Sequence, residues 1–451
     1  MNQRINWHIR LLVPGWLILV LLLVGCKTVK DKPLLERLNE LAGVTAVEIV
    51  NLSGFIKCFQ VDIIQPIDHR HPDGPTFQQR FYLSHRDESG PMVFYTTGYG
   101  ASRNSEKDIT AVINGNQILL VHRYFPDAVP SDNWEYCTTF QAASDQHRIR
   151  DIFKQVYSGR WVSSGGSKGG MTALFYRYYY PSDVDATVAY VAPLMNGTDD
   201  LRFAAYLEQL GSQGCRDKIK AFQRLILERK REIMPYFDSY IQSRGYEFNQ
   251  ISKEAALEYA VIEFWFAFWQ YGTDLDGSTI PGIENENDDQ ILLNYLLQIS
   301  PVSYYSDHGL QYYQPLFYQA YTELGYCTYL YSHLTDLLEV LEDPSYRAFA
   351  PRGTSLNFNP AVMAGIVDWL KNHGERIIYI YGEYDPWSAG AIIPATHLDA
   401  FMLMQPGANH RISILDLDQR ERVIDAFNRW LGLELRNASQ FRSIAEGPFR
   451  F

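Results

Sequence analysis

Basic residues are not in excess in this sequence: 40 Lys and Arg stand against 52 Asp and Glu, for a formal net charge of −12 at pH 7. Such a chain is repelled by phosphate backbones, which argues against a nucleic-acid-binding protein. Cysteine is also scarce, with five residues and no Cys-x-x-Cys pair, so a zinc site is not indicated. Hydrophobic content of 46% and charged content of 20% exclude a disordered chain and predict a large globular protein.

Long apolar runs are few, and the one at the amino terminus is short. Arg4 and Arg10 precede apolar residues 11–24, which end in Leu23-Val24-Gly25-Cys26. A run of about 15 residues is too short for a membrane-spanning helix, which needs about 20, and is typical of a signal peptide. The ending resembles a bacterial lipoprotein signal, with residues 1–25 removed, Cys26 lipidated and 26–44 as a tether. A single-pass anchor is the alternative.

The other four cysteines are Cys58, Cys137, Cys215 and Cys327. An even number in an exported chain permits two disulfides, and three pairings are then possible. The sequence does not choose among them.

A glycine-rich motif, Gly165-Gly-Ser-Lys-Gly169, joins a short apolar segment at 160–164 to a helical pattern at 168–180. A G-x-S-x-G sequence between a strand and a helix is the context of a nucleophile elbow. Glycines tolerate the tight reversal, and the amino end of the helix favours negative charge at the serine. We therefore predict that Ser167 is a nucleophile rather than an ordinary turn residue.

The elements around this motif indicate an α/β-hydrolase core, at residues 45–197 and 358–435, with a helical cap inserted at 198–357. Apolar and alternating patterns predict strands at 55–64, 76–84, 91–100, 118–125, 160–164, 185–192, 376–382 and 396–404. Helical periodicity predicts core helices at 134–157, 168–180, 360–371 and 415–431, and cap helices at 202–210, 218–244, 253–271, 288–297, 311–323 and 333–342. The aromatic stripe in 253–271 is more typical of cap core than of a substrate wall.

The order of candidate residues fits a catalytic triad. In this fold the acid and the histidine follow the serine, each in a loop after a later strand. Asp385 follows the strand at 376–382 and His410 follows the next one, so Ser167, Asp385 and His410 have the required order. Glu383 comes too early, and the alternative histidines, His122, His147 and His333, precede the required position or lie on predicted helices.

Two backbone N–H groups are candidates for an oxyanion hole. One belongs to Lys168, the residue after the nucleophile, and the other comes from the loop after the third core strand. That loop contains Tyr99, which also offers its hydroxyl. Ser167 Oγ would attack a carbonyl carbon while His410 takes its proton and Asp385 orients the imidazole. This chemistry needs no metal or cofactor and serves peptides and esters equally.

Several segments together resemble the bacterial secreted tripeptidyl aminopeptidases, which are serine peptidases distantly similar to prolyl carboxypeptidases. These segments are His122-Arg-Tyr-Phe125, Gln141-Ala-Ala-Ser-Asp145, Gly165-Gly-Ser-Lys-Gly-Gly170 and Ala192-Pro193. The resemblance is strongest over 91–193 and resumes over 376–410. It implies an enzyme that releases short peptides from free amino termini, and it allows a preference for proline beside the scissile bond.

An enzyme of that kind needs a buried acid to pair with the substrate ammonium. Asp199 and Asp200, where the cap begins, are candidates, although surface acids are the commoner interpretation. The expected partners are peptide substrates, and the membrane is contacted only through the lipid on Cys26 of an exported, cell-envelope protein. A carboxylesterase of the same fold and a non-catalytic binding lipoprotein remain the alternatives.

Overall fold

The computed structural model describes residues 32–51, 53–272, 275–284 and 288–435. The predicted signal peptide, Cys26 and the first residues of the tether lie outside these ranges. Within them, no helix combines the length and the apolar character that crossing a bilayer requires. The rest of the region expected to be a tether is folded in part, because Leu34 and Leu38 of its helix α1 (Leu34–Asn39) are buried against the sheet.

The described strands form one nine-stranded sheet in the order β1-β2-β3-β5-β4-β6-β7-β8-β9. They are β1 (Val44–Ile49), β2 (Lys57–Pro66), β3 (Thr76–His85), β4 (Met92–Thr96), β5 (Asn116–Leu120), β6 (Trp161–Gly166), β7 (Ala186–Tyr190), β8 (Ile377–Gly382) and β9 (Phe401–Gln405). The first three are antiparallel, and β5, β4, β6, β7, β8 and β9 are mutually parallel. Every residue of β4, β6, β7 and β8 is buried, as expected for parallel strands covered on both faces.

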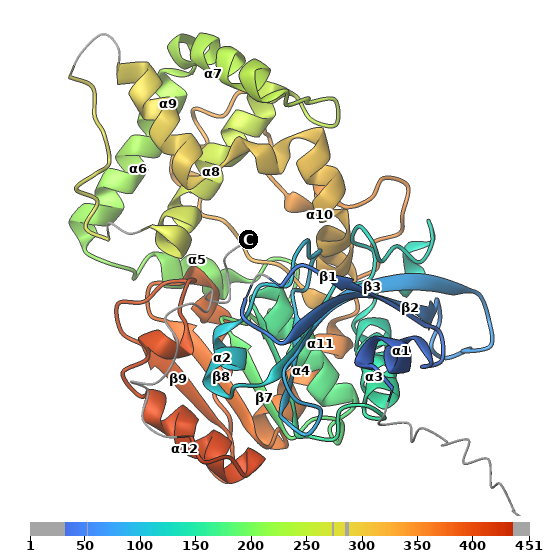
Figure 1. Ribbon diagram of the computed structural model, residues 1–451. Helices are drawn as coiled ribbons and strands as arrows, with labels where there is room; N and C mark the ends of the chain where they lie inside the picture. Colours follow the sequence, from blue (N-terminus) through green and yellow to red (C-terminus); the bar gives the residue numbers. More distant parts are fainter. Residues whose placement is uncertain (1–31, 52, 273–274, 285–287, 436–451) are drawn as a thin grey trace, which may run out of the picture.

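Helices cover both faces of this sheet (Figure 1). The core helices are α1 (Leu34–Asn39), α2 (Asp108–Val112), α3 (Thr139–Phe153), α4 (Lys168–Tyr179), α11 (Pro360–Asn372) and α12 (Arg420–Leu431). Apolar residues of α2 and α12 share one cluster with the sheet, whereas residues of α3, α4 and α11 lie in the clusters on its other face. This layered arrangement confirms the predicted α/β-hydrolase core.

A helical cap is inserted between β7 and β8 and forms the second lobe of the molecule (Figure 1). Its helices are α5 (Leu201–Leu207), α6 (Gln213–Glu228), α7 (Lys230–Arg244), α8 (Lys253–Tyr271), α9 (Asp288–Ile299) and α10 (Asp307–Gln319), the last continued by a π turn at Ala320–Leu324. Short 3-10 turns occupy Trp134–Tyr136, Val302–Tyr305, Ser332–Leu334, Tyr346–Phe349, Pro386–Gly390 and Ile414–Asp416. Helix α8 is the centre of the cap, because its aromatic stripe is buried; the stripe is Phe264, Trp265, Phe266, Phe268 and Trp269.

Long-range contacts explain where the predicted helices were wrong. The helix expected at 218–244 is broken at Arg229, because α6 packs on α8 whereas α7 packs on α9. The helix expected at 333–342 is only a short turn. Its backbone N–H groups at 339–341 donate instead to the carboxylate of Glu258 on α8, at 2.9–3.2 Å. The helix expected at 134–157 begins only at Thr139, after a separate turn.

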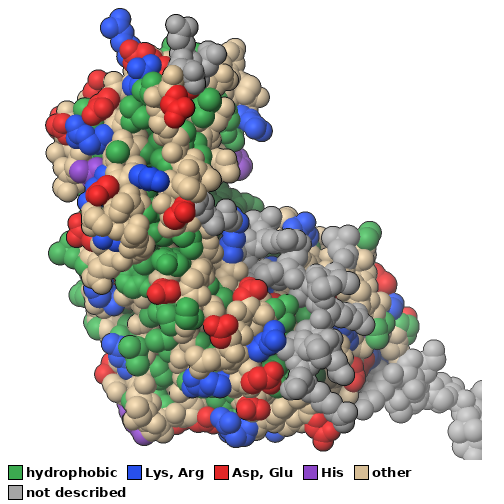
Figure 2. Space-filling model, turned by 90° about the vertical axis from the view of Figure 1, so that its left-hand side faces the viewer, with side chains coloured by type: hydrophobic (Ala, Val, Ile, Leu, Met, Phe, Trp, Pro, Cys, Tyr) green, Lys and Arg blue, Asp and Glu red, His purple; other side chains and the backbone are tan. Residues whose placement is uncertain are grey.

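The permitted disulfides are not formed. Cys58, Cys137, Cys215 and Cys327 are all buried free thiols. Their shielding from solvent suits apolar packing rather than cross-linking. On the face drawn in Figure 2, acidic and basic side chains of the described residues are interspersed over both lobes.

Candidate active site

Ser167 lies in the tight turn that joins β6 to α4. Its backbone has φ +56° and ψ −125°, a conformation that non-glycine residues adopt only where the surroundings impose it. The chain passes so close to itself that a Cβ on Gly165 would meet the Gly169 carbonyl oxygen at 2.3 Å, and a Cβ on Gly169 would meet the Thr96 oxygen at 2.2 Å. The flanking glycines are therefore required by close approach of the backbone, and the serine is held at the turn.

Asp385 and His410 follow β8 and β9, so both lie at the same edge of the sheet as Ser167. Their side chains are brought together: His410 Nδ1 lies 2.7 Å from Asp385 Oδ2, and the two residues are 1% and 0% exposed. This contact selects the tautomer in which Nε2 accepts a proton. The acid also accepts a hydrogen bond from the Trp387 N–H at 3.1 Å, which fixes its orientation. The alternative acid, Glu383, is exposed and accepts a hydrogen bond from the Gly407 N–H.

The predicted oxyanion loop reaches the elbow. A Cβ on Gly98 would lie 2.5 Å from the Gly169 nitrogen, so this loop and the start of α4 are in direct contact. Lys168 is the first residue of α4, where backbone N–H groups point out of the helix. The N–H of Tyr99, however, donates to Thr97 Oγ1 at 3.0 Å. The loop thus has the expected position, while that N–H has another acceptor.

The Lys168 side chain turns back beneath this loop, which the sequence did not indicate. Its Nζ donates to the Gly98 carbonyl oxygen at 2.9 Å and lies 3.4 Å from His122 Nε2. Burial lowers the pKa of Lys168 to about 7 and holds the pKa of His122 well below its usual range. A neutral His122 donates from Nδ1 to the Arg123 carbonyl and accepts at Nε2. His122 therefore supports the oxyanion loop instead of acting as the catalytic base.

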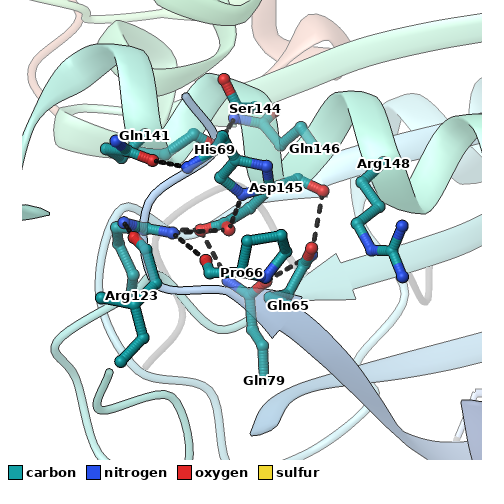
Figure 3. Close-up of polar contacts among 12 residues, drawn as sticks. Gln65, Pro66, His69, Gln79, Arg123, Gln141, Ser144, Asp145, Gln146 and Arg148 are labelled. Carbon is teal, nitrogen blue, oxygen red and sulfur yellow. Dashed lines mark hydrogen bonds and ion pairs between the residues drawn. The ribbon is translucent and has the colours of Figure 1, made fainter. Parts of the chain in front are cut away.

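A second buried network lies at the end of β5 (Figure 3). Arg123 and Asp145 form a bidentate ion pair at 2.7 and 2.8 Å, and both side chains are almost completely buried. Asp145 also contacts His69 Nε2 at 2.7 Å, and Arg123 donates to the carbonyl oxygens of Ile67 and Tyr136. This network ties the β2–β3 loop and the segment between β5 and α3 to α3. It gives Arg123 of the segment His122–Phe125 and Asp145 of the segment Gln141–Asp145 a structural role.

Asp199 and Asp200 are not placed as the hypothesis of an ammonium site requires. Asp200 is the N-cap of α5, accepts the Asn196 N–H at 2.8 Å and pairs with Arg202 at 2.7 Å. Asp199 is exposed. One carboxylate therefore already has a cation and the other faces solvent.

The cap contacts both sides of the catalytic loops. At the end of α8, the Gln270 carbonyl accepts the His410 N–H at 3.2 Å, and the Tyr271 ring stands perpendicular to the His410 ring with centroids 5.8 Å apart. From α10, the hydroxyl of Tyr312 accepts the Gly100 N–H at 3.2 Å. Helices α8 and α10 of the cap thus pack on the loops that carry His410 and Gly100. In the described part of the chain, no group of three or more His, Cys, Asp or Glu is arranged to hold a metal ion.

Comparison with known proteins agrees with this geometry. Residues 27–448 match the PS-10 peptidase S37 family. The chain is 34% identical over 409 residues, 88% of its length and 85% of the relative's, to a prolyl tri/tetrapeptidyl aminopeptidase of Streptomyces mobaraensis. It is 26% identical to the lysosomal Pro-X carboxypeptidase of Bos taurus over 28% of this chain and 29% of the relative.

Among solved structures, the chain is similar to a proline iminopeptidase of Mycobacterium smegmatis, with 13% identity, a TM-score of 0.36, and coverage of 82% of this chain and 97% of the other. The family match spans nearly the whole sequence and includes the elbow, the acid and the histidine. The chain therefore belongs to the PS-10 peptidase S37 family, and it is a serine peptidase with an α/β-hydrolase fold.

Proposed function

We propose that the protein is an exopeptidase that releases tripeptides, with a preference for proline at the cleaved bond, from the free amino termini of peptides. The observation that carries this proposal is the 34% identity, over 88% of the chain, to a prolyl tri/tetrapeptidyl aminopeptidase. The contacts of the cap with the catalytic loops support it, because a covered site favours chain ends over chain interiors.

In the proposed reaction, Ser167 Oγ attacks the carbonyl carbon of the third residue while His410 Nε2 takes the hydroxyl proton. The carbonyl oxygen becomes an oxyanion at the start of α4, where the Lys168 N–H and the Tyr99 loop would stabilise it. His410 then gives the proton to the leaving amine as the C–N bond breaks. A water molecule, deprotonated by His410, hydrolyses the acyl-enzyme and restores Ser167. Asp385 holds the imidazole throughout.

Three substrates separate this activity from the alternatives. The soluble form that begins after Cys26 is assayed with Ala-Ala-Pro-anilide, its N-acetylated twin and a short p-nitrophenyl ester, alongside Ser167→Ala. We expect rapid cleavage of the free-amino peptide and none in the variant. Ester hydrolysis without peptide hydrolysis would favour a carboxylesterase, and no turnover of any substrate would favour a binding protein.

We also propose that the protein is exported and held at the cell envelope by a lipid on Cys26. Support comes from the sequence alone: two arginines, a short apolar run and the Leu23-Val-Gly-Cys26 ending. Labelled palmitate should enter the wild-type protein in the producing bacterium and not a Cys26→Ser variant. Equal labelling of both, or of neither, would contradict this anchor.

A further inference from the structure

Glu263, near the middle of α8, is a buried carboxylate without a cation. Its Oε2 accepts hydrogen bonds from the hydroxyls of Tyr305 and Tyr346, the latter at 3.2 Å. Among the described residues, no Lys, Arg or His forms an ion pair with it. A buried carboxylate normally has such a partner, because desolvation of an unpaired charge costs several kcal/mol. Burial raises the pKa of Glu263, and a cationic ligand beside it would favour the ionised carboxylate.

Three other buried carboxylates of this chain have a basic partner, although Asp108, which is also fully buried, accepts hydrogen bonds from hydroxyls and backbone N–H groups and has no ion pair among the described residues. Glu258, five residues earlier on the same helix, lies 2.6 Å from Lys230 Nζ and accepts three backbone N–H groups. Asp145 has Arg123, and Asp385 has His410. Glu263 has only tyrosine hydroxyls, which stabilise a carboxylate without neutralising it.

Glu263 is enclosed by the protein and yet keeps some accessible surface. The same is true of Tyr99, Tyr271 and Tyr304, and Ser167 is likewise partly accessible. Side chains that are deep in a molecule and still accessible line an internal space. These partly accessible residues come from the elbow, the predicted oxyanion loop and the cap.

Ring contacts connect the two ends of this space. Tyr99, beside the elbow, contacts Tyr313 with centroids 5.9 Å apart, and Tyr313 contacts Tyr304 at 4.4 Å. Tyr304 in turn contacts Tyr305, which donates to Glu263. Burial raises the pKa of Tyr313 to about 12, with smaller contributions from Tyr312 and the Glu263 carboxylate.

The rise of helix α8 gives the distance along its axis between Glu263 and Tyr271, the residue that contacts His410. Glu263 precedes Tyr271 by eight residues, and at 1.5 Å per residue this is about 12 Å along the helix axis. Tyr271 contacts the ring of His410, the proposed general base, near which the scissile carbonyl would lie. An extended peptide spans at most about 3.3–3.6 Å per residue, so three residues reach about 10 Å from the ammonium to that carbonyl. A salt bridge of ordinary length between the substrate ammonium and the Glu263 carboxylate accounts for the remaining distance.

We propose that Glu263 binds the free ammonium group of the substrate and thereby sets the cleavage point about three residues from the amino terminus. This inference rests on the proposed exopeptidase activity and names the group that recognises its substrate. It replaces the hypothesis that Asp199 or Asp200 has this role. The incoming ammonium supplies a positive charge, and the tyrosine hydroxyls hold the carboxylate in position for it.

The test compares Glu263→Gln with wild type, using Ala-Ala-Pro-anilide and its N-acetylated twin. Glutamine keeps the shape and the acceptor for both tyrosines but removes the charge. We expect kcat/KM for the free-amino substrate to fall about 100-fold, the scale of a buried ion pair that loses one partner, while the acetylated substrate changes little. Asp199→Asn, the same chemical change at an exposed site, should leave both values unchanged.

A fluorophosphonate that carries no amine reports on Ser167 independently. Glu263→Gln should react with it at the wild-type rate, which shows that the elbow is intact. The inference is overturned if the variant keeps its preference for the free amino group, or if peptide cleavage and fluorophosphonate labelling fall together. If the wild-type enzyme reacts with the fluorophosphonate but cleaves neither peptide, the proposed function fails instead.

Discussion

Asp385 is distinguished from its neighbour Glu383 by burial and by its contact with His410. Asp385 is fully buried and touches the imidazole at 2.7 Å, whereas Glu383 is exposed. We expect Asp385→Asn to lower kcat about 10,000-fold, because an amide stabilises the wrong imidazole tautomer, with little change in KM. Glu383→Gln should keep activity within twofold. Steady-state kinetics on both variants checks this, and a large loss in Glu383→Gln alone would reverse the assignment.

Lys168 makes stability depend on pH. Its pKa is about 7 in the folded protein and 10.5 when unfolded, so between these values the unfolded chain binds the extra proton. Raising the pH through this window therefore favours the folded state, and lowering it removes that contribution. Relative to Lys168→Met, the free energy of unfolding of the wild type should rise by about 2 kcal/mol from pH 7 to pH 9. Urea denaturation at both pH values measures it, and a constant difference would show that Lys168 is not perturbed.

Ser167, Asp385 and His410 could be proposed as a triad from the sequence because each has a local signature. Ser167 lies within a five-residue motif, and Asp385 and His410 directly follow apolar strands. Glu263 has no such signature. Its partners, Tyr305 and Tyr346, are 42 and 83 residues away, and nothing local distinguishes it from Glu258 on the same helix. Whether a buried carboxylate has a cationic partner can be seen only in the folded structure, because the partner can come from a distant part of the sequence.

At the scale of elements, the elbow depends on the contact of β4, β6 and α4 at their backbones. We expect Gly169→Ala to destabilise the protein by about 1–3 kcal/mol and to abolish activity, because its Cβ would overlap the Thr96 carbonyl oxygen. Gly214→Ala, in α6, meets nothing within 4 Å and should be neutral or slightly stabilising. Thermal denaturation and peptide hydrolysis measure both effects, and an active Gly169→Ala protein would show that the elbow relaxes.

Helix α8 organises the cap through Glu258, which holds Lys230 of α7 and the segment 339–341. Lys230→Met leaves that carboxylate buried without its cation, at a cost of about 3–5 kcal/mol. Lys253→Met removes a cation from a solvent-exposed pair with Asp238 and should cost less than about 1 kcal/mol. Chemical denaturation gives the two values. Equal values would mean that the buried pair does not support the cap.

The same helix shows why some predicted elements were wrong. Residues 333–342 have a helical pattern, but a carboxylate that lies more than 80 positions away in the sequence takes three of their N–H groups. The break at Arg229 likewise follows from the different packing partners of α6 and α7. The helix patterns identified the rough location of most cap helices, while the break at Arg229, the loss of the last predicted helix and the helix ends depended on tertiary contacts.

For the whole molecule, the α/β-hydrolase core followed from the order of strands and helices, since parallel strands with alternating helices have few possible topologies. Because every residue in the central strands is buried, the apolar runs there were easy to recognise. The contacts of the cap with the loops at His410 and Gly100, and the four free thiols, could not be predicted from the order of elements. Both depend on which surfaces meet in three dimensions.

The most direct measurement of the central proposal is the order of products from an unblocked decapeptide with proline at position three. The wild-type protein should release the amino-terminal tripeptide first, together with the complementary heptapeptide, as identified by mass spectrometry over time. Ser167→Ala should release neither. Early fragments from internal bonds, or release of single residues from the carboxyl end, would contradict a covered site that cleaves three residues from a free amino terminus.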